Sequence, residues 1–108
     1  MIELSNPMNA CDYVSDWLVR NHERLGLKQI RLQRTEVPAP KFSAWYEAND
    51  CLVDICVWDH AHCLDILVLE KSSDSILLSE AGSCGDVEGL QKRLDLFANW
   101  AGERTAGA

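Results

Sequence analysis

The stretch that decides the fold runs from residue 51 to residue 70 and reads CLVDICVWDHAHCLDILVLE. Its two eight-residue segments, 51–58 and 63–70, place apolar side chains at every second position, which is the pattern of a half-buried β-strand. The four residues between them, DHAH, match the length of a hairpin loop. The sequence therefore predicts a β-hairpin in which Trp58 faces Cys63 and Val57 faces Leu64.

This register sorts the side chains of the hairpin between the two faces of a sheet, because successive residues of a strand point to opposite sides. One face is wholly apolar, and we expect helices to cover it. Its members are Val53, Ile55, Val57, Leu64, Ile66 and Val68. The opposite face mixes carboxylates, thiols, an indole and an aliphatic side chain. It carries Asp54, Cys56, Trp58, Cys63, Asp65 and Leu67.

A helix is predicted on each side of the strand region. Residues 7–25 carry apolar side chains at three- and four-residue spacing, with Asn6 as the capping residue, Pro7 at the first helical position and Gly26 as the stop. Residues 87–101 repeat this pattern behind Asp86 as a cap, and Leu96 and Trp100 widen the apolar face. We expect the tail from about residue 102 to be frayed.

The remaining segments predict about five strands in all. Ile30 and Leu32 alternate with polar neighbours in a short first strand, and the prolines at 38 and 40 interrupt the ladder before a second strand at 42–48. Turn residues at 48–50 and 72–75 separate the later strands. Short turns favour an antiparallel meander, since parallel neighbours need long crossovers. The expected fold is a single α+β domain over residues 1–108, with both helices packed on one face of the meander.

Composition narrows the classes of function. A net charge of -7 argues against a general nucleic-acid binder or a protein that binds anionic membranes. No apolar run approaches the roughly 18 residues that a membrane span requires, and the first residues lack the pattern of a signal peptide. The five cysteines are an odd number without a CxxC pair, which is typical of a reducing compartment. We therefore expect a cytoplasmic protein without nucleic-acid or membrane partners.

The loop of the hairpin raises the question of a metal site. His60 and His62 could bind an ion together, with Asp59 or Cys63 as a third ligand, but the sequence offers no second ligand pair for a tetrahedral zinc site. Two polar histidines at a hairpin tip are the simpler interpretation. We therefore expect neither a metal nor any other cofactor.

Catalytic patterns are weak throughout. Cys84 precedes the second helix and is the thiol best placed for a lowered pKa, yet no histidine or asparagine can be assigned as its partner. The chain contains no GxSxG, P-loop or GxGxxG motif. We expect a protein that is not an enzyme, and a small thiol- or metal-dependent enzyme stays open as a third class of function.

Charge is unevenly distributed. Between Glu47 and Glu88 there are ten acidic side chains and a single basic one, Lys71. This hints at one acidic face, although an evenly solvated surface explains the count equally well. Aromatic anchors beside charges are typical of protein-binding surfaces, and Trp45 joins Asp54 and Trp58 if its strand shares their register. The alternative, in which Trp58 packs under a loop, stays open.

Three segments together resemble the TriTu-type immunity proteins of bacterial polymorphic toxin systems. They are DYVSDWLVRNHERL, DICVWDHAHCLDILVLE and VEGLQKRLDLFANWA. The residues that carry the resemblance are Trp17, Leu18 and Asn21 in the first helix, Val57 and Trp58 at the end of one strand, and Cys63, Leu64 and Asp65 in the next. The segment EVPAPKF departs from the family's pattern and leaves the start of the second strand open.

The resemblance implies a small cytoplasmic antidote that binds a cognate toxin and occludes its active site or substrate path. An acidic face would suit a toxin with a basic cleft. The residues expected to bind the partner are Asp54, Trp58, Asp59 and Asp65, with Glu47 and Asp50 at the rim and Trp45 beside them. The free protein is expected to be a monomer or a weak dimer. The alternative is an acidic adaptor or secretion chaperone that holds a segment of a partner protein.

Overall fold

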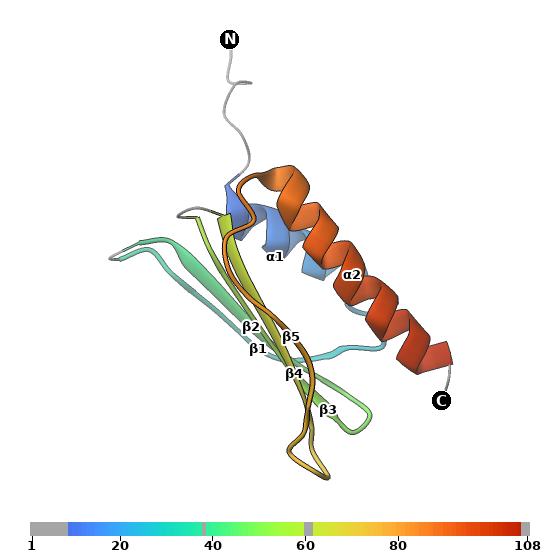
Figure 1. Ribbon diagram of the computed structural model, residues 1–108. Coiled ribbons are helices and arrows are strands. Elements are labelled where there is room, and N and C mark those ends of the chain that lie inside the picture. Colours follow the sequence, from blue (N-terminus) through green and yellow to red (C-terminus); the bar gives the residue numbers. More distant parts are fainter. Residues whose placement is uncertain (1–8, 38, 60–61, 107–108) are drawn as a thin grey trace.

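The computed structural model describes residues 9–37, 39–59 and 62–106, and it contains the predicted order of helix, five strands and helix. The elements are α1 (Ala10–Asn21), β1 (Lys28–Thr35), β2 (Lys41–Ala48), β3 (Cys51–Trp58), β4 (Cys63–Glu70), β5 (Ile76–Glu80) and α2 (Val87–Ala106). The strands form one antiparallel sheet in the order β1-β2-β3-β4-β5. Both helices lie on the same side of it (Figure 1). The predicted α+β meander is confirmed.

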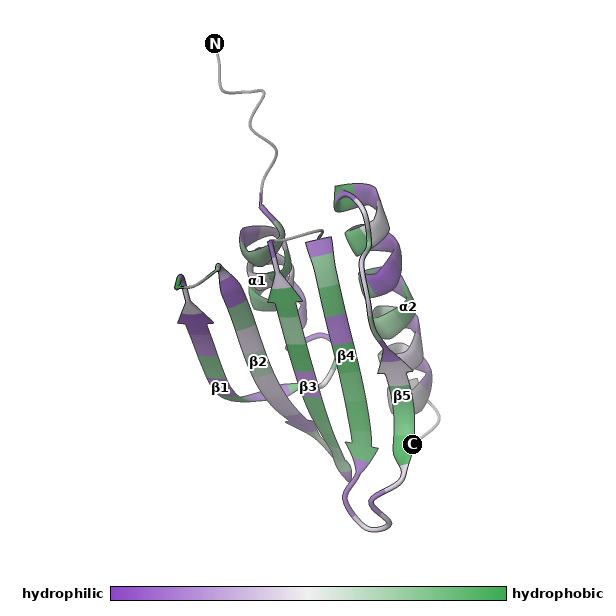
Figure 2. Ribbon diagram, turned by 60° about the vertical axis from the view of Figure 1, so that its left-hand side comes forward, coloured by the Kyte–Doolittle hydropathy of each residue, from purple (hydrophilic) through white to green (hydrophobic). Residues whose placement is uncertain are grey.

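The central hairpin has the predicted register. Trp58 lies opposite Cys63, and Val57 lies opposite Leu64. The six apolar residues assigned to the covered face are all at most 2% exposed. They pack against Cys11, Val14, Trp17 and Leu18 of α1 and against Leu90, Leu94 and Phe97 of α2. Figure 2 shows apolar character along β3, the central strand of the sheet, and along its neighbour β4.

Helix α1 begins later than the sequence predicts. Asn9 is its capping residue, and the side-chain oxygen of Asn9 accepts a hydrogen bond from the backbone N–H of Asp12 at 2.7 Å. Asn6 and Pro7, the expected start, lie outside the described residues. The helix also ends earlier, at Asn21, while Gly26 adopts the expected left-handed conformation with φ at 75°.

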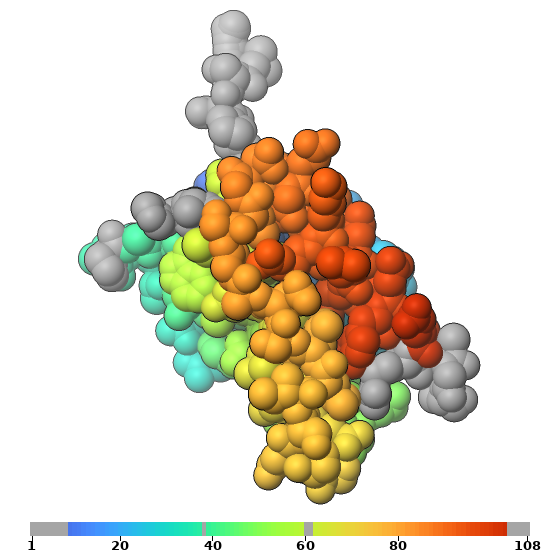
Figure 3. Space-filling view, viewed as in Figure 1, coloured from blue at the N-terminus to red at the C-terminus, as the bar shows by residue number. Residues whose placement is uncertain are grey.

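Helix α2 is capped as predicted, because the carboxylate of Asp86 accepts a hydrogen bond from the backbone N–H of Gly89 at 2.8 Å. The helix runs to Ala106, past the point where fraying was expected. Trp100 packs against the core and stacks on Phe97 with 6.2 Å between ring centroids. Leu96 was wrongly assigned to the apolar face, since it is 58% exposed. Figure 3 shows α2 and the segment that leads into it as one continuous surface.

Strand β1 forms one edge of the sheet and is exposed along its whole length. A β-bulge between Gln29 and Arg31 shifts its register against β2. The expected alternation of Ile30 and Leu32 on one face is therefore wrong. Ile30 turns towards the face opposite the helices, whereas Leu32 lies opposite Ala44, a residue of the covered face.

Candidate protein-binding face

The face of the sheet opposite the helices, called the outer face below, brings residues of four strands into one row. Arg31 of β1 lies opposite Trp45 of β2, Trp45 lies opposite Asp54 of β3, and Asp54 lies opposite Leu67 of β4. This register confirms that Trp45 shares the face of Asp54. Because each position is fixed by backbone pairing, the row is held in place before any partner binds.

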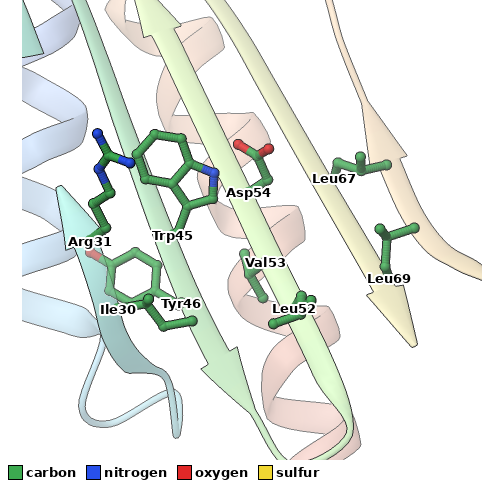
Figure 4. Close-up of a pocket in the computed structure, with 9 residues that line it drawn as sticks. All are labelled: Ile30, Arg31, Trp45, Tyr46, Leu52, Val53, Asp54, Leu67 and Leu69. Carbon is green, nitrogen blue, oxygen red and sulfur yellow. The ribbon is translucent and has the colours of Figure 1, made fainter. Parts of the chain in front are cut away.

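A depression of about 340 Å³ opens on this face (Figure 4). Aliphatic side chains from three strands supply most of its wall, and Trp45 and Asp54 stand at one end. The aliphatic residues are Ile30, Leu52, Leu67 and Leu69. Leu52 is 40% exposed and Ile30 is 55% exposed, so solvent-accessible apolar surface lies beside a carboxylate.

A second depression of about 390 Å³ continues past Trp45 and Asp54, which border both. Its other lining residues are polar or small. They are Gln33, Thr35, Lys41, Ser43 and Cys56. Together the two depressions form one trough with an apolar half, a polar half, and Trp45 and Asp54 at the junction. It is called the outer trough below.

Two cations fix the two tryptophans of the outer face. The guanidinium carbon of Arg31 lies 5.4 Å from the ring centroid of Trp45, and the Lys41 ammonium lies 5.0 Å from that of Trp58. Cations over indole faces are attracted by the ring quadrupole and restrict the motion of the ring. They also correct the expectation of one acidic face, because basic and acidic side chains share this surface.

Asp54 and Asp65 are the two carboxylates of the central hairpin on the outer face. Asp54 is partly buried and accepts a weak hydrogen bond from the Cys56 thiol at 3.6 Å. Over the residues that the structure describes, no lysine or arginine forms an ion pair with Asp54. Asp65 accepts a hydrogen bond from the backbone N–H of Gly82 at 3.2 Å, so it anchors the segment after β5.

Asp65 does not line the trough, and neither do the other three acidic residues expected at the site. Glu47 forms an ion pair with Lys71, which lowers the pKa of the Glu47 carboxyl. Asp50 accepts a hydrogen bond from the Ser72 hydroxyl at 2.5 Å and so joins two turns. Each of these carboxylates therefore has a partner within the chain, and Asp59 is bound in the same way.

Asp59 stabilises the start of α1. Its carboxylate accepts a hydrogen bond from the backbone N–H of Cys11 at 2.9 Å, at the end of the helix where N–H groups lack partners within the helix. The residue follows β3 directly, at the end of this central strand, and its hydrogen bond joins that end to α1. Its contact with the chain is structural, and it does not line the outer trough.

Burial raises the pKa of the thiols at both places where a cysteine lies near the start of a helix. Burial raises the pKa of Cys84, so the expectation that helix α2 would lower it is wrong. Burial, together with the Asp59 carboxylate, raises the pKa of Cys11 to about 12. Among the described residues, no three His, Cys, Asp or Glu side chains gather into a group that could hold a metal ion. His60 lies outside those residues.

Sequence reasoning missed the basic and aliphatic members of the outer trough. Arg31 and Lys41 would follow from the register alone, because they lie directly opposite Trp45 and Trp58. Leu52 and Leu69 also pair directly across β3 and β4. Ile30 could not be placed in this way, because only the bulge in β1 brings it to the outer face.

Comparison with known proteins adds no relative: no protein-family model, curated protein or solved structure matches the chain significantly. Within the described ranges, neither helix is long and apolar enough to cross a membrane. The outer trough is therefore the feature of the molecule on which a proposal of function rests.

Proposed function

We propose that this protein is an immunity protein, which binds a cognate bacterial toxin through the outer trough and blocks the active site or substrate path of that toxin. One observation carries the proposal. Trp45, under the Arg31 guanidinium, stands beside accessible aliphatic side chains on a sheet face that neither helix covers, and Trp58, under the Lys41 ammonium, lies on the same face beyond the trough. Anchors of this kind account for most of the binding energy at protein interfaces.

The rigidity of this face supports a tight complex. Trp45 lies on β2, and Asp54 and Trp58 lie on β3, two interior strands of the meander whose other sides are buried in the core. A surface fixed by backbone pairing loses little conformational entropy when a partner binds. Such preorganisation suits an antidote, which must stay bound to its toxin.

Charge favours a basic partner. The chain carries a net charge of -7, and long-range attraction raises the association rate of oppositely charged proteins. The resemblance to TriTu-type immunity proteins supports the same proposal. A toxin with a basic cleft, in which the carboxylates of this protein take the place of phosphates, is the partner that this charge fits best.

The accessible aliphatic wall of the trough also favours a second candidate, an acidic adaptor or secretion chaperone. Such a protein would hold an extended or unfolded segment, whereas an immunity protein caps a folded domain. The two differ in stoichiometry. A monomer in a one-to-one complex with a folded toxin domain supports immunity, and a dimer around an unfolded segment supports the chaperone.

A growth-rescue experiment tests the proposal. The terminal domain of the protein that co-purifies with this chain is expressed in a bacterial host, with and without this chain. We expect the domain to arrest growth and the chain to restore it. The double variant Trp45→Ala/Trp58→Ala should fail to restore growth, while Leu96→Ala, an exposed leucine on α2, should act as the wild type. A harmless domain, or rescue by the double variant, would contradict the proposal.

A further inference from the structure

We infer that the outer trough receives an arginine side chain of the partner, with its aliphatic stem against Leu52 and Leu67 and its guanidinium paired with Asp54. The identity of the partner rests on the proposed function, whereas the chemistry of the site rests on the trough itself.

Among the described residues no basic side chain forms an ion pair with Asp54, although basic residues share its face. The closest one in its row is Arg31, and the indole of Trp45 stands between the two (Figure 4). Arg31 is bound elsewhere, over the Trp45 ring and to the side-chain oxygen of Gln33 at 3.2 Å. On its other side Asp54 faces Leu67. A partly buried carboxylate between an indole and a leucine gains most from a cation that a partner supplies.

The space beside Asp54 has the volume and the apolar lining to accept a long side chain with an apolar stem. The depression holds about 340 Å³, which is at the lower end of the range of pockets for small ligands, about 300–1,000 Å³. Its wall away from Asp54 consists of Leu52, Leu69 and Ile30. Lysine and arginine bury their methylene groups along such surfaces while the charged head reaches a polar group.

Arginine fits this arrangement better than the alternatives. Its planar guanidinium can donate two parallel hydrogen bonds to one carboxylate and can lie against an indole, which an ammonium group cannot match. A purely apolar side chain would bury Asp54 without a partner, and that costs free energy. An acidic side chain would be repelled by Asp54 and by the net charge of the chain.

A peptide titration tests the inference without the natural partner. The probe is the blocked pentapeptide Ac-Ala-Leu-Arg-Leu-Ala-amide, and its control carries citrulline, which has the shape of arginine without the charge. Binding is followed by the NMR signal of the Trp45 indole N–H, assigned with Trp45→Phe. We expect the arginine peptide to shift this signal and to bind about tenfold more tightly than the citrulline peptide, as one partly buried ion pair would give.

Two variants with the same change in net charge locate the effect. Asp54→Asn should abolish the preference for arginine. Asp74→Asn should keep it, because Asp74 lies in an exposed turn at a φ of 59°, a conformation that asparagine tolerates well. Leu52→Thr, which shortens the apolar wall, should weaken both peptides equally. Matching thermal melting curves establish that the variants are folded.

The inference is overturned if the Trp45 signal does not move, if both peptides bind equally, or if Asp54→Asn keeps the preference. Analytical ultracentrifugation at the same protein concentration tests whether a second copy of the chain occupies the trough instead. A dimer that Asp54→Asn dissociates would show that it does, and would overturn the inference. These results are independent of growth rescue. Growth rescue without a preference for arginine would mean that the protein is an immunity protein that binds its toxin through another surface. A preference for arginine without growth rescue would mean that the trough binds arginine of a partner that is not a toxin.

Discussion

The carboxylate of Asp59 accepts a hydrogen bond from the backbone N–H of Cys11, 2.9 Å away, although 48 residues separate the two in sequence. This contact connects the end of β3 to the first turn of α1. It satisfies an N–H group that has no acceptor within the helix, and it places a negative charge at the positive end of the helix dipole. Asp59 therefore supports the fold, and the expectation that it also binds a partner stays a prediction.

Replacement of Asp59 by alanine tests this role. We expect Asp59→Ala to lower the free energy of unfolding by about 1–2 kcal/mol, the usual cost of losing a helix-capping interaction. Urea denaturation of the purified variant measures the loss. Asp16→Ala is the control, because its exposed ion pair with Arg20 contributes only about 0.3–0.5 kcal/mol. Equal losses for the two variants would contradict the assignment.

The second prediction concerns the start of α2, where the chain approaches itself closely. A Cβ atom on Gly89 would lie 2.1 Å from the carbonyl oxygen of Cys84, so Gly89→Ala must displace the segment before the helix. We expect a loss of about 1–3 kcal/mol, typical of overpacking. Gly102→Ala, in the same helix with open space around it, should instead stabilise the protein by about 0.5–1 kcal/mol. Chemical denaturation of both variants checks the opposite signs.

The third prediction is a loss of stability at alkaline pH caused by Cys11. Its thiol is fully buried, and its pKa is raised to about 12, whereas in the unfolded chain it ionises near 9.0. A pKa raised by folding stabilises the protein below pH 9, and this contribution is lost between pH 9 and pH 12, by at most about 1.4 kcal/mol per pH unit.

Cys11→Ser isolates this effect, because serine does not ionise in this range and Tyr46 is present in both proteins. The difference in unfolding free energy, wild type minus variant, should fall steadily above pH 9. Urea denaturation at several pH values measures it. A difference that stays constant from pH 8 to pH 11 would show that the Cys11 thiol does not make this contribution.

The fourth prediction concerns partner affinity. Trp45→Ala and Trp58→Ala should each weaken the complex by about 2 kcal/mol, or roughly thirtyfold, because buried indoles are typical hot spots of interfaces. Calorimetric titration with the purified partner measures the effect. Leu96→Ala is the control. Leu96 is an exposed residue of α2, in the helical layer on the other side of the sheet from the trough, so its replacement should leave affinity unchanged. Full affinity of the Trp45 variant would exclude the outer trough as the interface, and full affinity of both variants would exclude the outer face.

The sheet was predictable because its signal is local and periodic. Apolar residues at every second position from Val53 to Val57 and from Leu64 to Val68 left one register that buries all six. The same register placed Asp54 and Trp58 on the outer face, and Trp45 only on the condition, met in the structure, that its strand shared this register. The start of α1 was harder to predict, because Asn6 and Asn9 are both good capping residues and the pattern of spacing accepts either.

Contacts between distant segments could not be predicted from the sequence. Nothing next to Asp59 shows that its carboxylate binds α1, and nothing near Ile30 indicates the bulge that brings this side chain into the trough. The counts of charged residues led to the expectation of one acidic face for the same reason. They show an excess of acidic residues along the chain, but only the pairing of strands places Arg31 and Lys41 over the tryptophans of the outer face.

Affinity co-purification of the tagged chain from its native cells, followed by mass spectrometry, tests the central claim most directly. The account predicts one partner in a one-to-one ratio that ends in a toxin domain, and its loss when the bait carries Trp45→Ala and Trp58→Ala. Bait with Leu96→Ala should retain it. Recovery of no stoichiometric partner, or equal recovery with the double variant, would contradict the claim that the outer trough binds a toxin.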